Sequence, residues 1–137
     1  NSDGMVEGFI ARLSAAGTVK WKQRFSGDGN QRVHALALAA GGLFLAGSLD
    51  DSGVLGAAQV PHTSGVDMVI ASLDRETGEV LSLQVSEGTG NEWPAAIAVD
   101  AQGGAWITGD FSAGFSFAGE QATANGDFDA FLLRLPP

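Results

Sequence analysis

The stretch that decides the fold is GFIARL at Gly8–Leu13, because it returns as MVIASL at Met68–Leu73 and as AFLLRL at Ala130–Leu135. An internal repeat is the first feature to look for, since overlooking one misassigns the whole fold. The apolar positions that coincide in the three copies are Phe9, Val69 and Phe131; Ile10, Ile70 and Leu132; and Leu13, Leu73 and Leu135.

Further blocks keep the same register at a spacing of about 60 residues. They pair Gly17–Val19 with Gly78–Val80, Gly27–Asn30 with Gly88–Asn91, Ala35–Leu38 with Ala96–Val99, and Gly42–Gly47 with Gly104–Gly109. Length differences between the copies fall in glycine-rich turns. The chain is therefore a repeat protein, with each copy one supersecondary unit.

Each block is typical of a β-strand. From Val19 to Phe25, the polar residues Lys20, Lys22 and Arg24 alternate with mostly apolar ones. This period of two predicts a strand with one wet and one buried face. No stretch sustains a helical apolar period between capping residues, so we expect an all-β chain.

Two runs resemble the repeat unit of bacterial β-propellers of the seven-bladed-propeller-repeat type. They are Ile97–Asp110 (IAVDAQGGAWITGD) and Asn125–Leu135 (NGDFDAFLLRL). The resemblance implies four-stranded antiparallel blades: a small inner strand, a glycine hairpin, an aromatic second strand and a D-x-F-x-x-x-L strand. The units here are longer than the 40–50 residues usual for a blade, with surplus residues at 48–66 and 110–128. They are too few for a seven-bladed ring.

Mapped onto that pattern, the chain is one complete blade between two partial ones, so the ring within it is incomplete. The expected divisions are 1–33 for the last two strands of a preceding blade (8–13 and 18–25), 34–94 for the complete blade (34–39, 43–49, 67–73 and 79–86), and 95–137 for the first three strands of a following blade. Pro136 and Pro137 stand where its outer strand would begin. Three explanations are open: a piece of a longer propeller, copies that assemble into a ring, or a partner that supplies the missing strand.

Charge and composition exclude several partners. Sixteen acidic and seven basic residues give a net charge of −9. Phosphate binding needs a cationic surface, so we expect neither nucleic acid nor an anionic membrane surface as a partner. No apolar run is long enough to insert into a membrane, and the absence of cysteine removes thiolate chemistry.

Four residues are candidates for ligand binding: Trp93, His34, Glu92 and Arg32. His34 begins an inner strand, where it serves either as a ligand-contacting or acid–base group or as a structural cap. Trp93 departs from the repeat, since Arg32 is its counterpart, and with Glu92 it lies where propellers bind ligands. It either stacks on a sugar or peptide or covers a blade edge.

Oxygen-bearing side chains at Asp28 and Asn30 predict at most a weak calcium site. The alternating D-x-[DN]-x-[DN]-G spacing of calcium loops is absent, so solvated turn residues are the competing interpretation. No other cofactor is expected. The chain has no G-x-S-x-G, H-E-x-x-H or Walker-type motif, and we assign no catalytic residue.

The function expected first is a non-catalytic module that serves as scaffold or binding surface for protein or glycan. The parent would be an exported bacterial protein, secreted, periplasmic or on the cell surface. One alternative is part of a propeller hydrolase or lyase whose active groups lie in other blades. Another is a self-assembling structural repeat. Fold alone does not choose among them.

Overall fold

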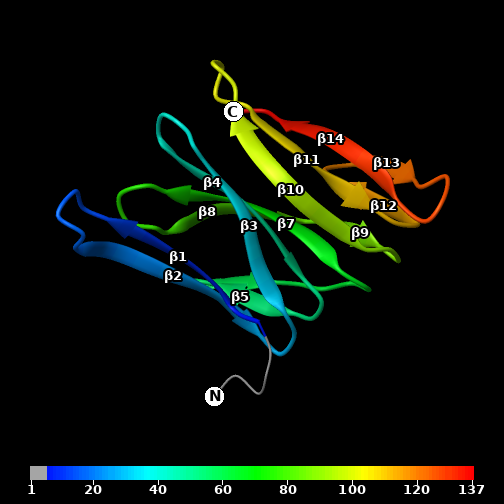
Figure 1. Cartoon of the computed structure of the whole chain (residues 1–137), viewed down its shortest axis with the longest axis horizontal. Coiled ribbons are helices and arrows are strands. Elements are labelled where there is room, and N and C mark those ends of the chain that lie inside the picture. The colour runs from blue at the N-terminus through cyan, green and yellow to red at the C-terminus, as the bar shows by residue number, and fades with distance from the viewer. Residues whose placement is uncertain (1–5) are drawn as a thin grey trace.

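The computed structural model describes residues 6–137, and the first five residues of the predicted 1–33 division lie outside it. Fourteen β-strands and no helix form the described part of the chain. It therefore holds no helix long and apolar enough to cross a membrane. The strands form four small antiparallel sheets that do not close into a ring (Figure 1). The predicted all-β class, with four-stranded antiparallel sheets and an incomplete ring, is confirmed.

The central sheet, here sheet II, is a four-stranded meander. Its order is β3 (Gln31–Leu38), β4 (Gly42–Leu49), β7 (Asp67–Asp74) and β8 (Val80–Val85). The sequence predicts strands at these four places, and only the start of β3 differs by more than two residues. β3 begins earlier because Gln31 and Arg32 already pair with the end of β4.

Sheet I precedes it along the chain and contains an unexpected hairpin. Its strands are β1 (Gly8–Leu13), β2 (Val19–Gly27), β5 (Gly53–Leu55) and β6 (Ala58–Val60), in that order. The surplus segment 48–66, for which the repeat predicts no strand, supplies β5 and β6. β5 pairs with the last residues of β2, Phe25 to Gly27.

The third copy of the repeat is divided between two sheets. Sheet III has the order β10 (Glu92–Val99), β11 (Ala105–Phe111) and β14 (Asp129–Leu135). Sheet IV consists of β9 (Glu87–Gly88), β12 (Gly114–Phe117) and β13 (Glu120–Thr123), with β12 in the middle. Here too the surplus segment forms a hairpin, β12–β13, rather than a loop.

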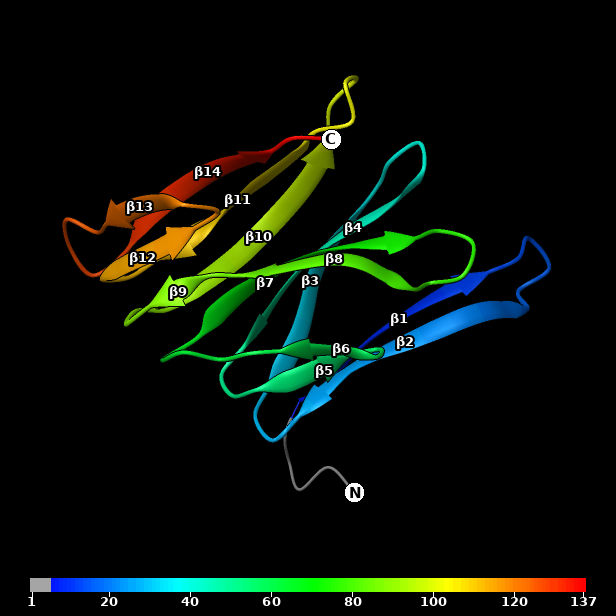
Figure 2. The same cartoon turned by 180° about the vertical axis from the view of Figure 1, so that it is seen from behind.

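The two hairpins make equivalent contacts with the preceding unit. β5–β6 joins the far end of β2, and β12–β13 joins β9, which continues the path of β8 (Figure 2). Each hairpin thus hydrogen-bonds to the outer strand of the preceding unit. The extra length of the repeat ties consecutive units together through backbone hydrogen bonds.

Sheet II lies between sheets I and III, so apolar side chains are buried on both of its faces (Figure 1). β7 shows why, because its apolar run buries alternate residues on opposite sides. The cluster shared with sheet I contains Ile10, Phe25, Leu43, Leu45, Leu49, Leu55, Val60, Val69, Ala71 and Leu73. The cluster shared with sheets III and IV contains Ala46, Met68, Ile70, Ala105, Ile107, Phe111, Phe115, Phe117 and Phe131.

Candidate functional site

An open groove of about 370 Å³ lies beside the start of β3. Arg32 and His34, two of the four predicted ligand-binding residues, line it from the same strand. Glu7 and Phe9 complete it from the β1 side. Phe9 is 74% exposed, an unusual state for a large aromatic side chain. The groove thus combines a cation, an imidazole and an aromatic face.

A β-bulge positions His34. The register between β3 and β4 shifts between Val33 and Ala35, so His34 is the extra residue. Its Nε2 lies 2.7 Å from the hydroxyl of the buried Ser48. Burial, and then the nearby charge of Arg32, lower the pKa of His34 below its usual value. One ring nitrogen is thus held by Ser48, and the lowered pKa favours the neutral imidazole.

Trp93 lies outside this groove. It is half-buried on β10, and its ring packs on Phe128 at a centroid distance of 5.6 Å. Phe128 is 54% exposed. The two rings form a separate aromatic surface at the same end of the strands. The structure therefore brings Arg32 and His34 together in one groove and places Trp93 on a second surface, formed by sheet III.

Glu92 is fully buried, so a ligand on the surface does not reach it. Ser86 donates a hydrogen bond to its Oε2 at 2.8 Å, and Oε1 has no partner among the described residues. Burial raises the pKa of Glu92 to about 7; the hydrogen bond from Ser86 opposes that rise, and the charge of Asp67 adds to it. Glu92 lies at a junction between sheets. Beside it, the Asp67 carboxylate accepts hydrogen bonds from the backbone N–H and the hydroxyl of Thr63.

The side chain of Asn30 is already hydrogen-bonded within the chain. The side-chain amide of Asn30 donates to Asp50 at 2.7 Å, and its oxygen accepts the backbone N–H of Val6 at 3.1 Å. Burial acts to raise the pKa of Asp50, but the hydrogen bonds from Asn30 outweigh it and the pKa is lowered. Asp28 is exposed. Among residues 6–137, no three His, Cys, Asp or Glu side chains are placed to hold a metal.

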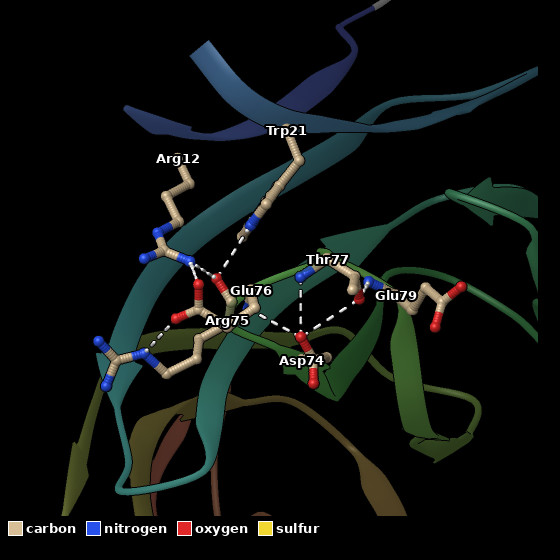
Figure 3. Close-up of polar contacts among 7 residues, drawn as sticks. All are labelled: Arg12, Trp21, Asp74, Arg75, Glu76, Thr77 and Glu79. Carbon is tan, nitrogen blue, oxygen red and sulfur yellow. Dashed lines mark hydrogen bonds and ion pairs between the residues drawn. The ribbon is translucent and has the colours of Figure 1, made fainter. Parts of the chain in front are cut away.

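At the opposite end of the strands, a polar cluster ties sheet I to the β7–β8 turn (Figure 3). The Arg75 carbonyl accepts hydrogen bonds from Arg12 Nη1 at 2.7 Å and from Trp21 Nε1 at 3.0 Å. Arg12 also pairs with Glu76 at 2.5 Å. Asp74 closes the turn by accepting the backbone N–H groups of Glu76 and Thr77. These groups connect two sheets, and nothing in their arrangement points to a ligand.

Phe9 and Glu7 also line the groove, although neither was predicted as a site residue. Phe9 occupies a repeated core position, and its counterpart Val69 is fully buried. Phe9 is exposed because no described sheet covers that face of sheet I. No local sequence signal marks this difference. Glu7 forms an ion pair with Arg24, which accounts for one of the basic residues of β2.

A scan against models of known protein families matches none of them, and a search of curated proteins finds no similar protein.

Proposed function

We propose that the chain is a run of β-propeller units of the bacterial seven-bladed-repeat type, and that it acts as a binding module. The order of sheet II supports the architecture, because four sequential antiparallel strands per unit is the form of a propeller blade. Repeated stacking of such units through apolar faces supports it as well. The module would belong to an exported bacterial protein.

The observation that carries the binding role is the groove shared by Arg32, His34 and Phe9. Arg32 forms no ion pair among the described residues, so its guanidinium is available to a ligand. An exposed aromatic ring offers a stacking face, and the Arg and His nitrogens offer directional hydrogen bonds. This chemistry suits a glycan or a peptide segment. Trp93 and Phe128 provide a second aromatic surface at the same end of the strands.

The test is a glycan and peptide array probed with the labelled chain, followed by titration of any hit. We expect Arg32→Ala and Phe9→Ala each to weaken binding of the hit at least tenfold. Lys20→Ala, which also removes one positive charge but lies on exposed β2, is the matched control and should leave affinity unchanged. Equal effects of Arg32→Ala and Lys20→Ala would show that net charge, not the groove, drives binding.

Self-assembly is a second candidate, favoured by the large apolar side chains on the two outer faces of the stack. Phe9 on sheet I and Leu132 on sheet III are 74% and 65% exposed. Faces of this kind mark contact surfaces. The solution mass measured over a range of concentrations tests this role: a ring-forming chain gives a discrete symmetric oligomer, whereas a binding module without self-association stays monomeric.

A further inference from the structure

A cleft of about 390 Å³ lies between sheets I and II, beside their outer strands β2 and β8. None of its lining residues belongs to the groove at Arg32, so the proposed function does not use it. Three residues line the cleft on the side of sheet I and three around the start of β8: Gln23, Ala57, Ala58, Glu79, Val80 and Leu81.

The Gln23 side chain forms a fixed polar wall of the cleft. Its Nε2 donates a hydrogen bond to the carbonyl of Gly78 at 2.9 Å, which ties β2 to the turn between β7 and β8. Its Oε1 lies beside Gly56 in the turn of the β5–β6 hairpin, where a Cβ would come within 2.7 Å of it. The hydrogen bond from Nε2 fixes the orientation of the amide, and the amide oxygen remains an acceptor for a ligand.

A β-bulge brings two aliphatic side chains to the opposite wall. β8 pairs Ser82 with Ser72 and Val80 with Leu73, so Leu81 is the extra residue of the strand. Val80 packs on the apolar cluster shared with sheet I, whereas Leu81 is 62% exposed. Together they offer a surface on which the methylene chain of a long side chain can lie.

Glu79 gives the cleft a negative charge that the chain itself does not neutralise. Its carboxylate forms no ion pair among residues 6–137. Figure 3 shows its side chain directed away from the pair formed by Arg12 and Glu76. The lining residues include no basic residue and no second acid. A cation supplied by another molecule would therefore complete the site through a charge-assisted hydrogen bond.

The first unit of the repeat lacks this chemistry at the same positions. β1 and β2 contain the same bulge, and by its register Thr18 and Lys20 are the counterparts of Glu79 and Leu81. A hydroxyl and a cation thus stand where the cleft has a carboxylate and an aliphatic side chain. Since the bulge forms in β2 without them, Glu79 and Leu81 are not residues that the repeat itself requires.

From these groups we propose that the cleft binds the side chain of a lysine presented by a partner protein. The methylenes of the lysine would lie on Val80 and Leu81, and its ammonium would meet the Glu79 carboxylate and the Gln23 oxygen. Lysine fits better than arginine, because no aromatic ring lines the cleft for a guanidinium to stack on. One ammonium fits better than a free diamine, since Glu79 is the one acid in the lining. The net charge of −9 favours the approach of a basic partner.

The experiment titrates the whole isotope-labelled chain with Nα-acetyl-lysine N-methylamide and follows the backbone amide shifts by NMR. We expect saturable shifts at residues 79–81 and at Gln23. The norleucine analogue, which has the alkyl chain without the ammonium, should bind more weakly by about threefold or more. Glu79→Gln should weaken lysine binding by a similar factor, and Leu81→Lys should abolish the shifts by repelling the ammonium. Glu120→Gln, at an exposed acid of sheet IV, is the matched control and should leave the affinity unchanged.

Several results would overturn the proposal. Equal affinity for the norleucine analogue would mean that the cleft does not recognise the ammonium. Equal weakening by Glu79→Gln and Glu120→Gln would assign the binding to net charge. Saturable shifts outside the cleft, or none in a folded chain, would exclude the site. Tighter binding of cadaverine would assign the cleft to a free diamine rather than to a protein partner. The site does not rest on the groove at Arg32, because Arg32→Ala should leave these shifts unchanged.

Discussion

Glu92 and Gln31 occupy equivalent positions of the repeat, but Glu92 carries a carboxyl group there and Gln31 an amide. Each is the first residue of an inner strand, each is fully buried, and each pairs with the last residue of the next strand, Phe111 and Leu49. Gln31 is neutral at every pH, whereas Glu92 is neutral only when protonated. Because the pKa of Glu92 rises to about 7, the folded protein holds that proton well above the usual range of a glutamic acid.

This residue should make stability depend on pH. The folded state binds the proton more tightly than the unfolded chain, so the contribution of Glu92 is complete below pH 4.5 and is lost as pH rises to about 7. Glu92→Gln, which copies Gln31, should therefore raise the free energy of unfolding at pH 8 by about 1–3 kcal/mol and change it little at pH 4. Urea unfolding at both pH values measures this. Glu120→Gln, at an exposed acid, is the control.

Parallel pH profiles for the wild type and Glu92→Gln would contradict this account. They would mean that Glu92 has the same protonation state in the folded and unfolded chains across the range. The profile of Glu120→Gln should follow that of the wild type throughout.

At the scale of elements, two turns of similar backbone shape differ in what surrounds them. Gly17 joins β1 to β2 with φ of 79°, and Gly78 joins β7 to β8 with φ of 78°. Both need the left-handed conformation that glycine tolerates best. A Cβ on Gly17 would meet nothing within 4 Å, whereas a Cβ on Gly78 would lie 2.6 Å from the Trp21 ring. Only the second turn is packed against a neighbouring sheet.

The two alanine variants separate the backbone cost from the packing cost. Gly17→Ala should destabilise the chain by about 1 kcal/mol, the cost of a side chain at positive φ. Gly78→Ala should lower the free energy of unfolding by about 2–4 kcal/mol. The Trp21 ring must also move there, and the hydrogen bond that it donates to the Arg75 carbonyl weakens. Thermal unfolding of both variants checks this. Equal losses would show that the Trp21 ring shifts freely and that the contact contributes no stability.

At the scale of the whole molecule, the position of a unit in the stack decides whether its faces are covered. Ile70 and Leu132 are equivalent in the repeat, yet Ile70 is 3% exposed and Leu132 is 65% exposed. Ile70 lies on the face of sheet II that sheet III covers. The corresponding face of sheet III has no described sheet on it. Chemically similar residues in one register therefore contribute very different amounts of buried apolar area.

Serine substitution at these two positions should show the difference directly. Ile70→Ser should lower the free energy of unfolding by about 3 kcal/mol or more, because it removes buried apolar volume and buries a hydroxyl. Leu132→Ser should change it by less than about 0.5 kcal/mol. Chemical denaturation followed by circular dichroism measures both. A large loss for Leu132→Ser at low protein concentration would mean that sheet III is covered in solution.

Most of the strands were predictable, and the inserts were not. Strands with a clear period of two or a repeated apolar run, such as β2 and β7, are visible because their signal is local. β5 and β12 are short, and what stabilises them is pairing with the outer strand of the preceding unit, which no local pattern reports. Among the site candidates, Arg32 and His34 share a groove because they share a strand, whereas Trp93 belongs to another sheet.

The sequence by itself determined the repeat, the all-β class and the places of the repeated strands, since these follow from periodicity, glycine turns and apolar alternation along neighbouring residues. Tertiary structure alone decided that Glu92 is buried, that Phe9 lines an open groove and that Gln23 and Glu79 line one cleft. The physical reason is that burial depends on which sheet lies across a face. The exposure of equivalent residues such as Val69 and Phe9 therefore depends on neighbours that are distant in sequence.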